Sequence, residues 1–311
     1  MVEPYDEHRS SVRDRVMTTF NAFWFGRPLS AFQWACLSSF VRRGHELRPH
    51  VYEHMEVPAG VMPVDASKTL PRSELFFIAN PFTGNADVGP FSDLFRYKLL
   101  LDQGGWYVDV DTICLAEDYP DDIRAWAQEN EKVERRVVIN GAQMCMPPGD
   151  PLAAELYAQC RAVGHTSERR EDWGPNLLTR VIVDLGLPPN QFGTTESFYP
   201  VDWISAFILM LPQYRNEIAR RASNALFLAA YQSFFLYCGV DLARTPPSGS
   251  YLRETYETLA PSKIAPGPGL LVDEVLSQVR AFVLRNKSWA IEQLNYSMPG
   301  ILEELGLEKV N

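Results

Sequence analysis

The 311-residue sequence lacks the marks of secreted, membrane-spanning and nucleic-acid-binding proteins. Its five cysteines are odd in number and form neither a CxxC pair nor a cluster with histidine, which excludes a disulfide framework and a structural zinc and predicts reduced thiols. The longest apolar run, WISAFILML before Pro212, is far shorter than the ~20 residues of a membrane-spanning helix. The first 20 residues lack the apolar core of a secretion signal.

The sequence also lacks an excess of positive charge. A net charge of −10 argues against a surface that neutralises the phosphates of a nucleic acid, although a local basic pocket for one small anion remains compatible with it. Composition is otherwise that of a globular protein, with 46% hydrophobic and 12% aromatic residues. We therefore expect a cytoplasmic protein with no nucleic-acid partner and no transmembrane segment.

Short apolar stretches alternate with helical patterns through the first half of the chain, which predicts an α/β fold. From about Tyr199 the pattern becomes mostly helical, and a segment from Leu270 to Tyr296 carries valines on one face of a single long helix. We expect a catalytic domain over 15–260 and a helical C-terminal segment over 261–311 packed on it. The expected strands are 21–26, 46–54, 106–115 and 135–148, and the expected helices are 30–45, capped by Ser30, 92–103, capped by Ser92, and 150–164.

Two aspartates interrupt an apolar run that reads as a buried strand, WYVDVDTICL. Because alternate residues of a strand point the same way, Asp109 and Asp111 are expected on one face, with Val110 on the other. Two neighbouring carboxylates repel each other and are costly to bury unless a cation offsets their charge. A divalent Mg²⁺ or Mn²⁺ ion that also binds substrate phosphates would do so. The alternative is a pair of solvated aspartates at a strand edge.

The helix before this strand places a carboxylate and a guanidinium on one face. Asp93 and Arg96 are three residues apart, so they are neighbours on the helix surface. They form either an intrahelical ion pair or a ligand-binding pair in which Asp93 accepts from sugar hydroxyls and Arg96 faces an anionic or hydroxylated group.

The stretch SDLFRYKLLLDQGGWYVDVDTICL, Ser92 to Leu115, resembles the DXD sugar-binding region of the glycosyltransferases related to the yeast α-1,6-mannosyltransferase and bacterial capsular-polysaccharide transferases. More remotely it resembles the clostridial glucosylating toxins. The fixed positions of the pattern S-D-x-x-R-Y-x-x-L-x-x-x-G-G-x-Y-x-D-x-D are all met. Further similar pieces follow in order: FWFGRPLS, GVMPVDAS, WGPNLLTR, FYPVDW and GSYLRETY.

The resemblance implies a GT-A-like nucleotide-sugar-binding fold, a metal-dependent hexosyl transfer from a nucleoside-diphosphate sugar that proceeds with retention of configuration, and a role in polysaccharide synthesis. A UDP-sugar is the expected donor, with GDP-mannose as the alternative. The acceptor is a hydroxyl of a glycan, a lipid-linked glycan or a protein. By position, the resemblance implies catalytic and metal-binding roles for Asp109 and Asp111, and donor-binding roles for Trp24, Asp93, Arg96, Tyr107 and Gln232.

One departure concerns the metal site. Relatives commonly carry a histidine followed by Leu-Trp-Asn in the C-terminal half, whereas here Ala229, or Phe227 in a shifted register, stands at the histidine position. Gln232, a backbone carbonyl or water must then complete the coordination. The residue pair Trp173-Gly174 followed by Pro175 is either a pocket wall or a tight turn with a packed tryptophan.

Two other classes of protein remain open. Phosphohydrolases of the haloacid-dehalogenase type also carry D-x-D at a strand end, but they need a threonine four residues after the first aspartate, where Ile113 stands here. A degenerate transferase domain that binds a nucleotide or a partner without turnover is compatible with the missing histidine.

Overall fold

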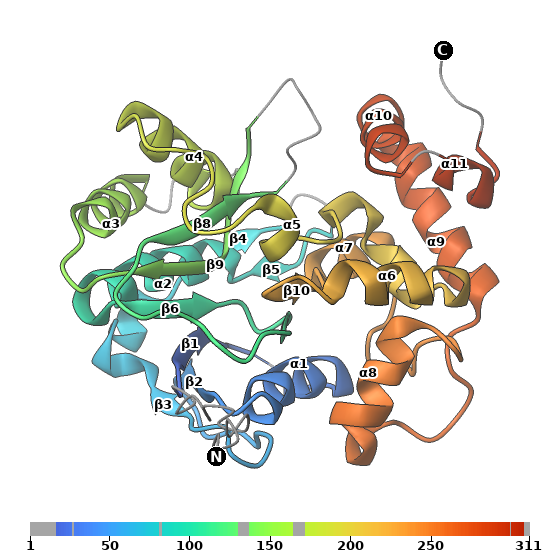
Figure 1. Ribbon diagram of the computed structural model, residues 1–311, viewed down its shortest axis with the longest axis horizontal. Coiled ribbons are helices and arrows are strands. Elements are labelled where there is room, and N and C mark those ends of the chain that lie inside the picture. Colours follow the sequence, from blue (N-terminus) through green and yellow to red (C-terminus); the bar gives the residue numbers. More distant parts are fainter. Residues whose placement is uncertain are drawn as a thin grey trace, which may run out of the picture.

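The structure of the protein is a computed structural model that describes residues 17–26, 28–80, 83–129, 137–163, 172–298 and 300–307. Its main sheet has the order β3-β2-β1-β6-β9-β8 (Figure 1). The strands of this sheet are β1 Thr19–Phe23, β2 Glu46–Val51, β3 Val64–Asp65, β6 Gly105–Val108, β8 Ala125–Gln128 and β9 Ile139–Met146. β1, β2, β3 and β6 pair in parallel, while β9 runs antiparallel to both β6 and β8. The predicted α/β fold is confirmed.

Two small antiparallel sheets lie beside the main one. The first pairs β7 Thr112–Cys114 with β10 Phe227–Ala229, and the second pairs β4 Ile78–Ala79 with β5 Ala86–Asp87. The described helices are α1 Ala31–Arg42, α2 Gly89–Gln103, α3 Pro151–Val163, α4 Pro175–Asp184, α5 Thr195–Phe198, α6 Arg215–Ala222, α7 Gln232–Cys238, α8 Tyr251–Leu259, α9 Val272–Arg285, α10 Lys287–Ser297 and α11 Ile301–Glu304. Short 3₁₀ helices cover Ala66–Lys68, Arg72–Glu74, Trp203–Met210, Pro212–Tyr214 and Pro261–Lys263.

The period-2 alternation of β6 divides the apolar core between the two faces of the main sheet. Trp106 and Val108 belong to a cluster with the buried residues of α1 and of the C-terminal helices. Tyr107 points to the other face, into a cluster formed by α2, α3 and α4. Figure 1 shows α3 and α4 at one side of the molecule and α9, α10 and α11 at the other. The site is built where β6 ends between these two clusters.

Some local predictions hold and others need correction. Ser30 caps α1 with a reciprocal capping box to Gln33, and Gly104, with a φ of 64°, ends α2 as expected. Helix α2, however, begins at Gly89, because Pro90 supplies the preset φ of a first helical turn. Ser92 therefore caps nothing and instead contacts the hydroxyl of Tyr107 at 3.2 Å.

The C-terminal segment contains two helices where one was predicted. Helix α9 ends at Arg285, and α10 starts after Asn286, whose backbone leaves the helical region with a φ of −111° and a ψ of 28°. Val275, Val279 and Val283 are buried in the same cluster as α1, and Val272 packs against it. The division of the chain at 260/261 stays a prediction.

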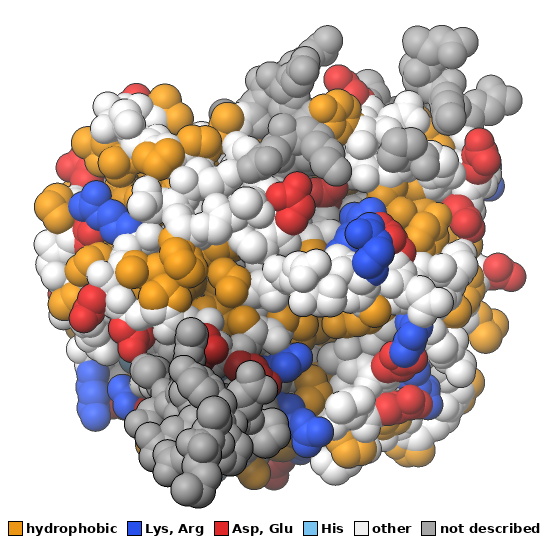
Figure 2. All heavy atoms as spheres, viewed as in Figure 1, with side chains coloured by type: hydrophobic (Ala, Val, Ile, Leu, Met, Phe, Trp, Pro, Cys, Tyr) orange, Lys and Arg blue, Asp and Glu red, His pale blue; other side chains and the backbone are white. Residues whose placement is uncertain are grey.

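Among the coloured side chains of Figure 2, lysine and arginine lie in small groups, many of them beside acidic residues, and they form no continuous basic stripe on that face. In the part of the chain that the structure describes, no helix has both the length and the apolar character required to cross a bilayer. All five cysteines are buried and free.

Candidate functional site

The two aspartates lie in a turn between two sheets, and the single strand predicted over 106–115 is wrong. β6 stops at Val108, and the chain turns at Asp109–Asp111 before β7 begins in the small sheet with β10. The Asp109 N–H donates to Ala142 O of β9 at 2.8 Å, and the Thr112 N–H donates back to Asp109 O at 3.0 Å. The side-chain directions of the two aspartates are therefore set by this turn and not by strand alternation.

Asp111 is held by the segment that follows β10. Its backbone carbonyl accepts from the Ala230 N–H at 2.9 Å, and its Oδ2 accepts from the Gln232 N–H at 2.8 Å. These contacts join residues more than 110 positions apart in the chain. They fix the second aspartate to the N-terminus of α7.

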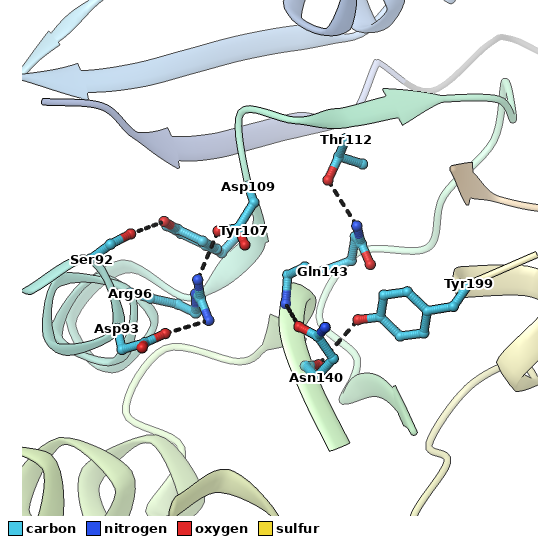
Figure 3. Close-up of polar contacts among 10 residues, drawn as sticks. Ser92, Asp93, Arg96, Tyr107, Asp109, Thr112, Asn140, Gln143 and Tyr199 are labelled. Atoms are coloured by element: carbon cyan, nitrogen blue, oxygen red, sulfur yellow. Dashed lines mark hydrogen bonds and ion pairs between the residues drawn. The ribbon is translucent and has the colours of Figure 1, made fainter. Parts of the chain in front are cut away.

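Arg96 connects the helix pair to the turn. Its Nη1 lies 2.9 Å from Asp93 Oδ1 and its Nη2 lies 2.7 Å from Asp109 Oδ1, while the guanidinium stacks 4.7 Å above the Tyr107 ring (Figure 3). The Arg96 side chain is only 6% exposed. Burial by itself would lower the pKa of Arg96, but the charges of Asp109 and Asp93 outweigh it and raise that pKa above its ordinary value. The pair Asp93–Arg96 thus forms an ion pair and also positions Asp109.

Two glycines press against this ion-pair cluster. A Cβ at Gly174 would lie 2.7 Å from Asp93 Oδ2, and a Cβ at Gly141 would overlap an Arg96 terminal nitrogen. Neither glycine has a positive φ, so their requirement is steric. The absence of a side chain at both positions lets the buried charges approach one another.

Replacing Gly141 with alanine should disturb Arg96 directly. We expect Gly141→Ala to lower the free energy of unfolding by about 1–3 kcal/mol, because overpacking forces a buried side chain off its position. The same change should reduce any activity of the site. Urea unfolding measures the first effect, and Gly174→Ala, which acts on Asp93, should move it in the same direction. Unchanged unfolding curves for both variants would contradict this account of the glycines.

The turn and the ion pairs line one cavity of about 640 Å³. Six of the seven predicted site residues line it: Trp24, Asp93, Arg96, Asp109, Asp111 and Gln232. The seventh, Tyr107, is fully buried beneath Arg96 and is absent from the lining, and burial raises its pKa to about 12. Tyr107 is therefore placed to support Arg96 and not to touch a ligand.

Trp24 follows β1 at the rim of this cavity. Phe23 is buried in the core, whereas Trp24 is half-buried and lines both this cavity and a neighbouring one of about 510 Å³ that also contains Trp34, Tyr52 and Lys263. Its backbone N–H donates to His50 O at 3.1 Å. The ring thus has a surface available to a ligand between two connected hollows.

The histidine position of the relatives contains no ligand here. Phe227 is in the core and Ala229 pairs with Thr112. Gln232 meets Asp111 through its backbone, while its side-chain Oε1 accepts from Gln33 Nε2 at 2.5 Å. Within the described ranges, no group of three or more His, Cys, Asp or Glu residues is arranged to hold a metal ion. At the turn itself, Asp109 and Asp111 supply two carboxylates at the cavity wall.

Sequence reasoning missed several residues of the cavity wall. Glu129, Asn140 and Trp289 line it, and Pro175 does as well, whereas Trp173 is buried against Phe76. Asn140 is a polar residue within the apolar run of β9, as the aspartates are within the apolar run after Gly105. The sequence therefore carried a signal for Asn140 as well. Nothing local in the sequence marks Glu129 or Trp289.

The turn that follows β6 thus brings two aspartates beside a buried arginine at the wall of one cavity. Residues 50–130 match the family model of the glycosyltransferase sugar-binding region containing the DXD motif. The match includes Asp93, Arg96 and both aspartates, and it confirms the predicted class: a glycosyltransferase with a DXD sugar-binding region.

Comparisons over the whole chain were made with curated proteins and with solved structures. A search of curated proteins found no significant match. Among solved structures the chain is similar to the PaToxG glycosyltransferase, with 11% sequence identity, a TM-score of 0.41, and coverage of 79% of this chain and 87% of that chain.

Proposed function

We propose that the protein transfers a hexose from a nucleoside-diphosphate sugar, foremost a UDP-sugar, to a hydroxyl acceptor, with Mn²⁺ or Mg²⁺ as cofactor. The observation that supports this function is the meeting of Asp109 and Asp111 with the buried Asp93–Arg96 pair in one cavity. The acceptor is a hydroxyl of a glycan, a lipid-linked glycan or a protein, and the reaction serves polysaccharide synthesis. The protein is proposed to act in the cytoplasm. Five buried free thiols are compatible with a reducing compartment.

The donor set at the turn fits a hard divalent cation. Mg²⁺ and Mn²⁺ are commonly bound through one or two carboxylates, with the remaining positions filled by substrate phosphates and water. Asp109, whose side chain is 32% exposed, and Asp111 supply two such carboxylates at the cavity wall. When bound there, the cation would stabilise the negative charge of the departing diphosphate. The third ligand left open by the missing histidine then need not come from the protein.

The other residues of the cavity bind and orient the donor. Trp24 offers a π-face to the nucleobase, since any base can stack on an aromatic ring. Asp93 accepts hydrogen bonds from the hydroxyls of the transferred sugar, and Arg96 holds Asp93 and Asp109 in place beneath it. The acceptor oxygen bonds to the anomeric carbon as the bond to the diphosphate breaks. Attack from the leaving-group face gives retention, and the diphosphate takes the proton of the acceptor.

A metal-dependent binding and hydrolysis assay tests this function. Nucleotide sugars with Mn²⁺ should raise the melting temperature by several degrees, since a ligand at about 100 Kd adds about 2.7 kcal/mol to the folded state. UDP-glucose, UDP-galactose, UDP-N-acetylglucosamine and GDP-mannose form the panel, and the ligand that binds best should be hydrolysed slowly with water as acceptor. Chelation by EDTA should abolish both signals. A panel without any shift or hydrolysis would refute the proposal.

A binding domain without turnover is the second candidate, and the absence of the histidine favours it. Its signature would be a Mn²⁺-dependent shift with UDP while no sugar is released from any nucleotide sugar of the panel. The phosphohydrolase class is not favoured, because the position that needs a threonine holds Ile113, which is buried in β7.

A further inference from the structure

Glu129 carries a buried oxygen without a hydrogen-bond partner at the wall of the cavity. It follows β8, and its backbone N–H donates to Val138 O of β9 at 2.8 Å. Its Oε2 accepts from Asn140 Nδ2 at 3.2 Å, whereas its Oε1 has almost no exposed area and no well-formed hydrogen bond from the residues that the structure describes. Buried polar atoms in folded proteins are nearly always paired, so this oxygen points to a ligand.

Tyr231 has a second such atom beside it. Its hydroxyl is also buried without a partner, and the residue lines the same cavity. Its backbone has a φ of 50°, a left-handed conformation that is rare for an aromatic residue. The contacts of Ala230 and Gln232 with Asp111 fix the backbone on both sides of this residue. Strain retained at a cavity wall is typical of a functional position.

The Tyr231 hydroxyl lies close enough to the Glu129 carboxyl for a hydrogen-bonding interaction that lowers the pKa of Glu129 and raises that of Tyr231. The geometry falls short of a well-formed hydrogen bond, so Glu129 Oε1 and the hydroxyl each retain capacity for a ligand. Desolvation and the charge of Asp202 raise the pKa of Glu129 to about 7, against the hydrogen bonds from Asn140, Tyr231 and the Trp203 backbone. Tyr199, another titratable group nearby, donates to Asn140 O at 3.1 Å (Figure 3).

We propose that Glu129 and Tyr231 form a hydroxyl-binding subsite of the cavity, in which one hydroxyl of a carbohydrate substrate donates to Glu129 Oε1 and accepts from Tyr231. A hydroxyl has one donor and two acceptor sites, so a single group satisfies both orphaned atoms. This inference rests on the proposed transferase function and adds two positioning residues to it.

The charge of Glu129 limits which part of the substrate it can meet. A carboxylate beside Asp202 repels a diphosphate, which belongs with Asp109, Asp111 and the cation. The hydroxyl therefore comes either from the transferred sugar or from the acceptor that attacks it. The two sources differ in the kinetic constant that the subsite controls.

Titration and hydrolysis with matched ligands test the subsite. UDP and UDP-glucose, or the nucleotide sugar that the panel above selects, are titrated with Mn²⁺ into the wild type, Glu129→Gln, Tyr231→Phe and the double variant. Glu257→Gln and Tyr214→Phe, which make the same chemical changes outside the cavity, are the controls. Hydrolysis is measured on the same proteins, and water then takes the place of the acceptor.

The Kd for UDP should stay within about twofold of the wild type in every variant. If the hydroxyl belongs to the transferred sugar, Kd and KM for the nucleotide sugar should rise at least about fivefold. If it belongs to the attacking group, those constants should hold while kcat of hydrolysis falls at least about fivefold. In either case the affected constant of the double variant should differ by no more than about twofold from that of the more impaired single variant, because both side chains contact one hydroxyl.

The pH profile separates binding from a structural role. A hydroxyl donates more strongly to an ionised carboxyl, so the affected constant should improve between about pH 6 and 8 in the wild type and stay flat in Glu129→Gln. Unchanged Kd, KM and kcat in both variants, with UDP still bound, would overturn the subsite and leave the transferase proposal intact. Equal weakening of UDP and the nucleotide sugar with a lower melting temperature would also overturn it. Failure of the wild type to bind UDP would overturn both.

Discussion

Asp111→Asn should reduce metal-dependent hydrolysis of the nucleotide sugar by about 100-fold or more while the protein stays folded. The change removes one of the two negative charges that the turn offers to a cation, and a cation that stabilises a departing diphosphate contributes several kcal/mol to the transition state. An asparagine oxygen can still accept the hydrogen bond that Asp111 Oδ2 receives from the Gln232 N–H at 2.8 Å. The loss should therefore appear in activity and in Mn²⁺ affinity but not in melting temperature.

The control for this substitution is Asp102→Asn at the end of α2. Asp102 is exposed and pairs with Lys98 at 2.6 Å, away from the cavity. Its replacement should change neither activity nor Mn²⁺ affinity, since exposed pairs of this kind contribute only about 0.3–0.5 kcal/mol. Full activity of Asp111→Asn at saturating Mn²⁺ would remove the support for a cation at the turn.

Arg96→Met should be the most destabilising change in the site, with a loss of about 3–5 kcal/mol of unfolding free energy. The methionine fills much of the volume of the arginine but deprives both Asp93 and Asp109 of the guanidinium that pairs with them. Removal of one partner of a buried ion pair is costly for this reason, even where the intact pair adds little. Chemical denaturation at pH 7.5 measures the loss.

The pH dependence of this deficit distinguishes lost charge pairing from lost packing. Acid favours the neutral form of a carboxyl group that has lost its positive partner, so the difference between Arg96→Met and the wild type should be smaller at pH 4 than at pH 7.5. Arg96→Lys keeps a positive charge and should lose less stability, although a single ammonium cannot reproduce the fork that reaches both aspartates. A deficit that is equal at both pH values would show that packing, and not charge, is responsible.

The residues of the site were predictable where local patterns carried them. Helix α2 placed Asp93 and Arg96 on one face, and the apolar run around the aspartates marked them as unusual. The family resemblance then brought in Trp24 and Gln232, and the structure places both at the same cavity. Their individual roles stay predictions.

Other features depend on contacts that no local pattern contains. The break of the strand at Asp109 follows from pairing of β7 with β10, which is more than 110 residues away in the chain. Glu129 is an ordinary acidic residue in the sequence and becomes notable only because β9 and Tyr231 bury it. Tyr107 looked like a pocket residue because of its motif, and it lies beneath Arg96 instead.

The aspartate turn also joins two separate sheets. Asp109 is anchored to β9 of the large sheet, whereas Asp111 is anchored to the segment between β10 and α7. The gap between the two carboxylates therefore depends on how the small sheet is placed against the large one. The spacing of the motif thus reports the relative position of the two halves that surround the cavity.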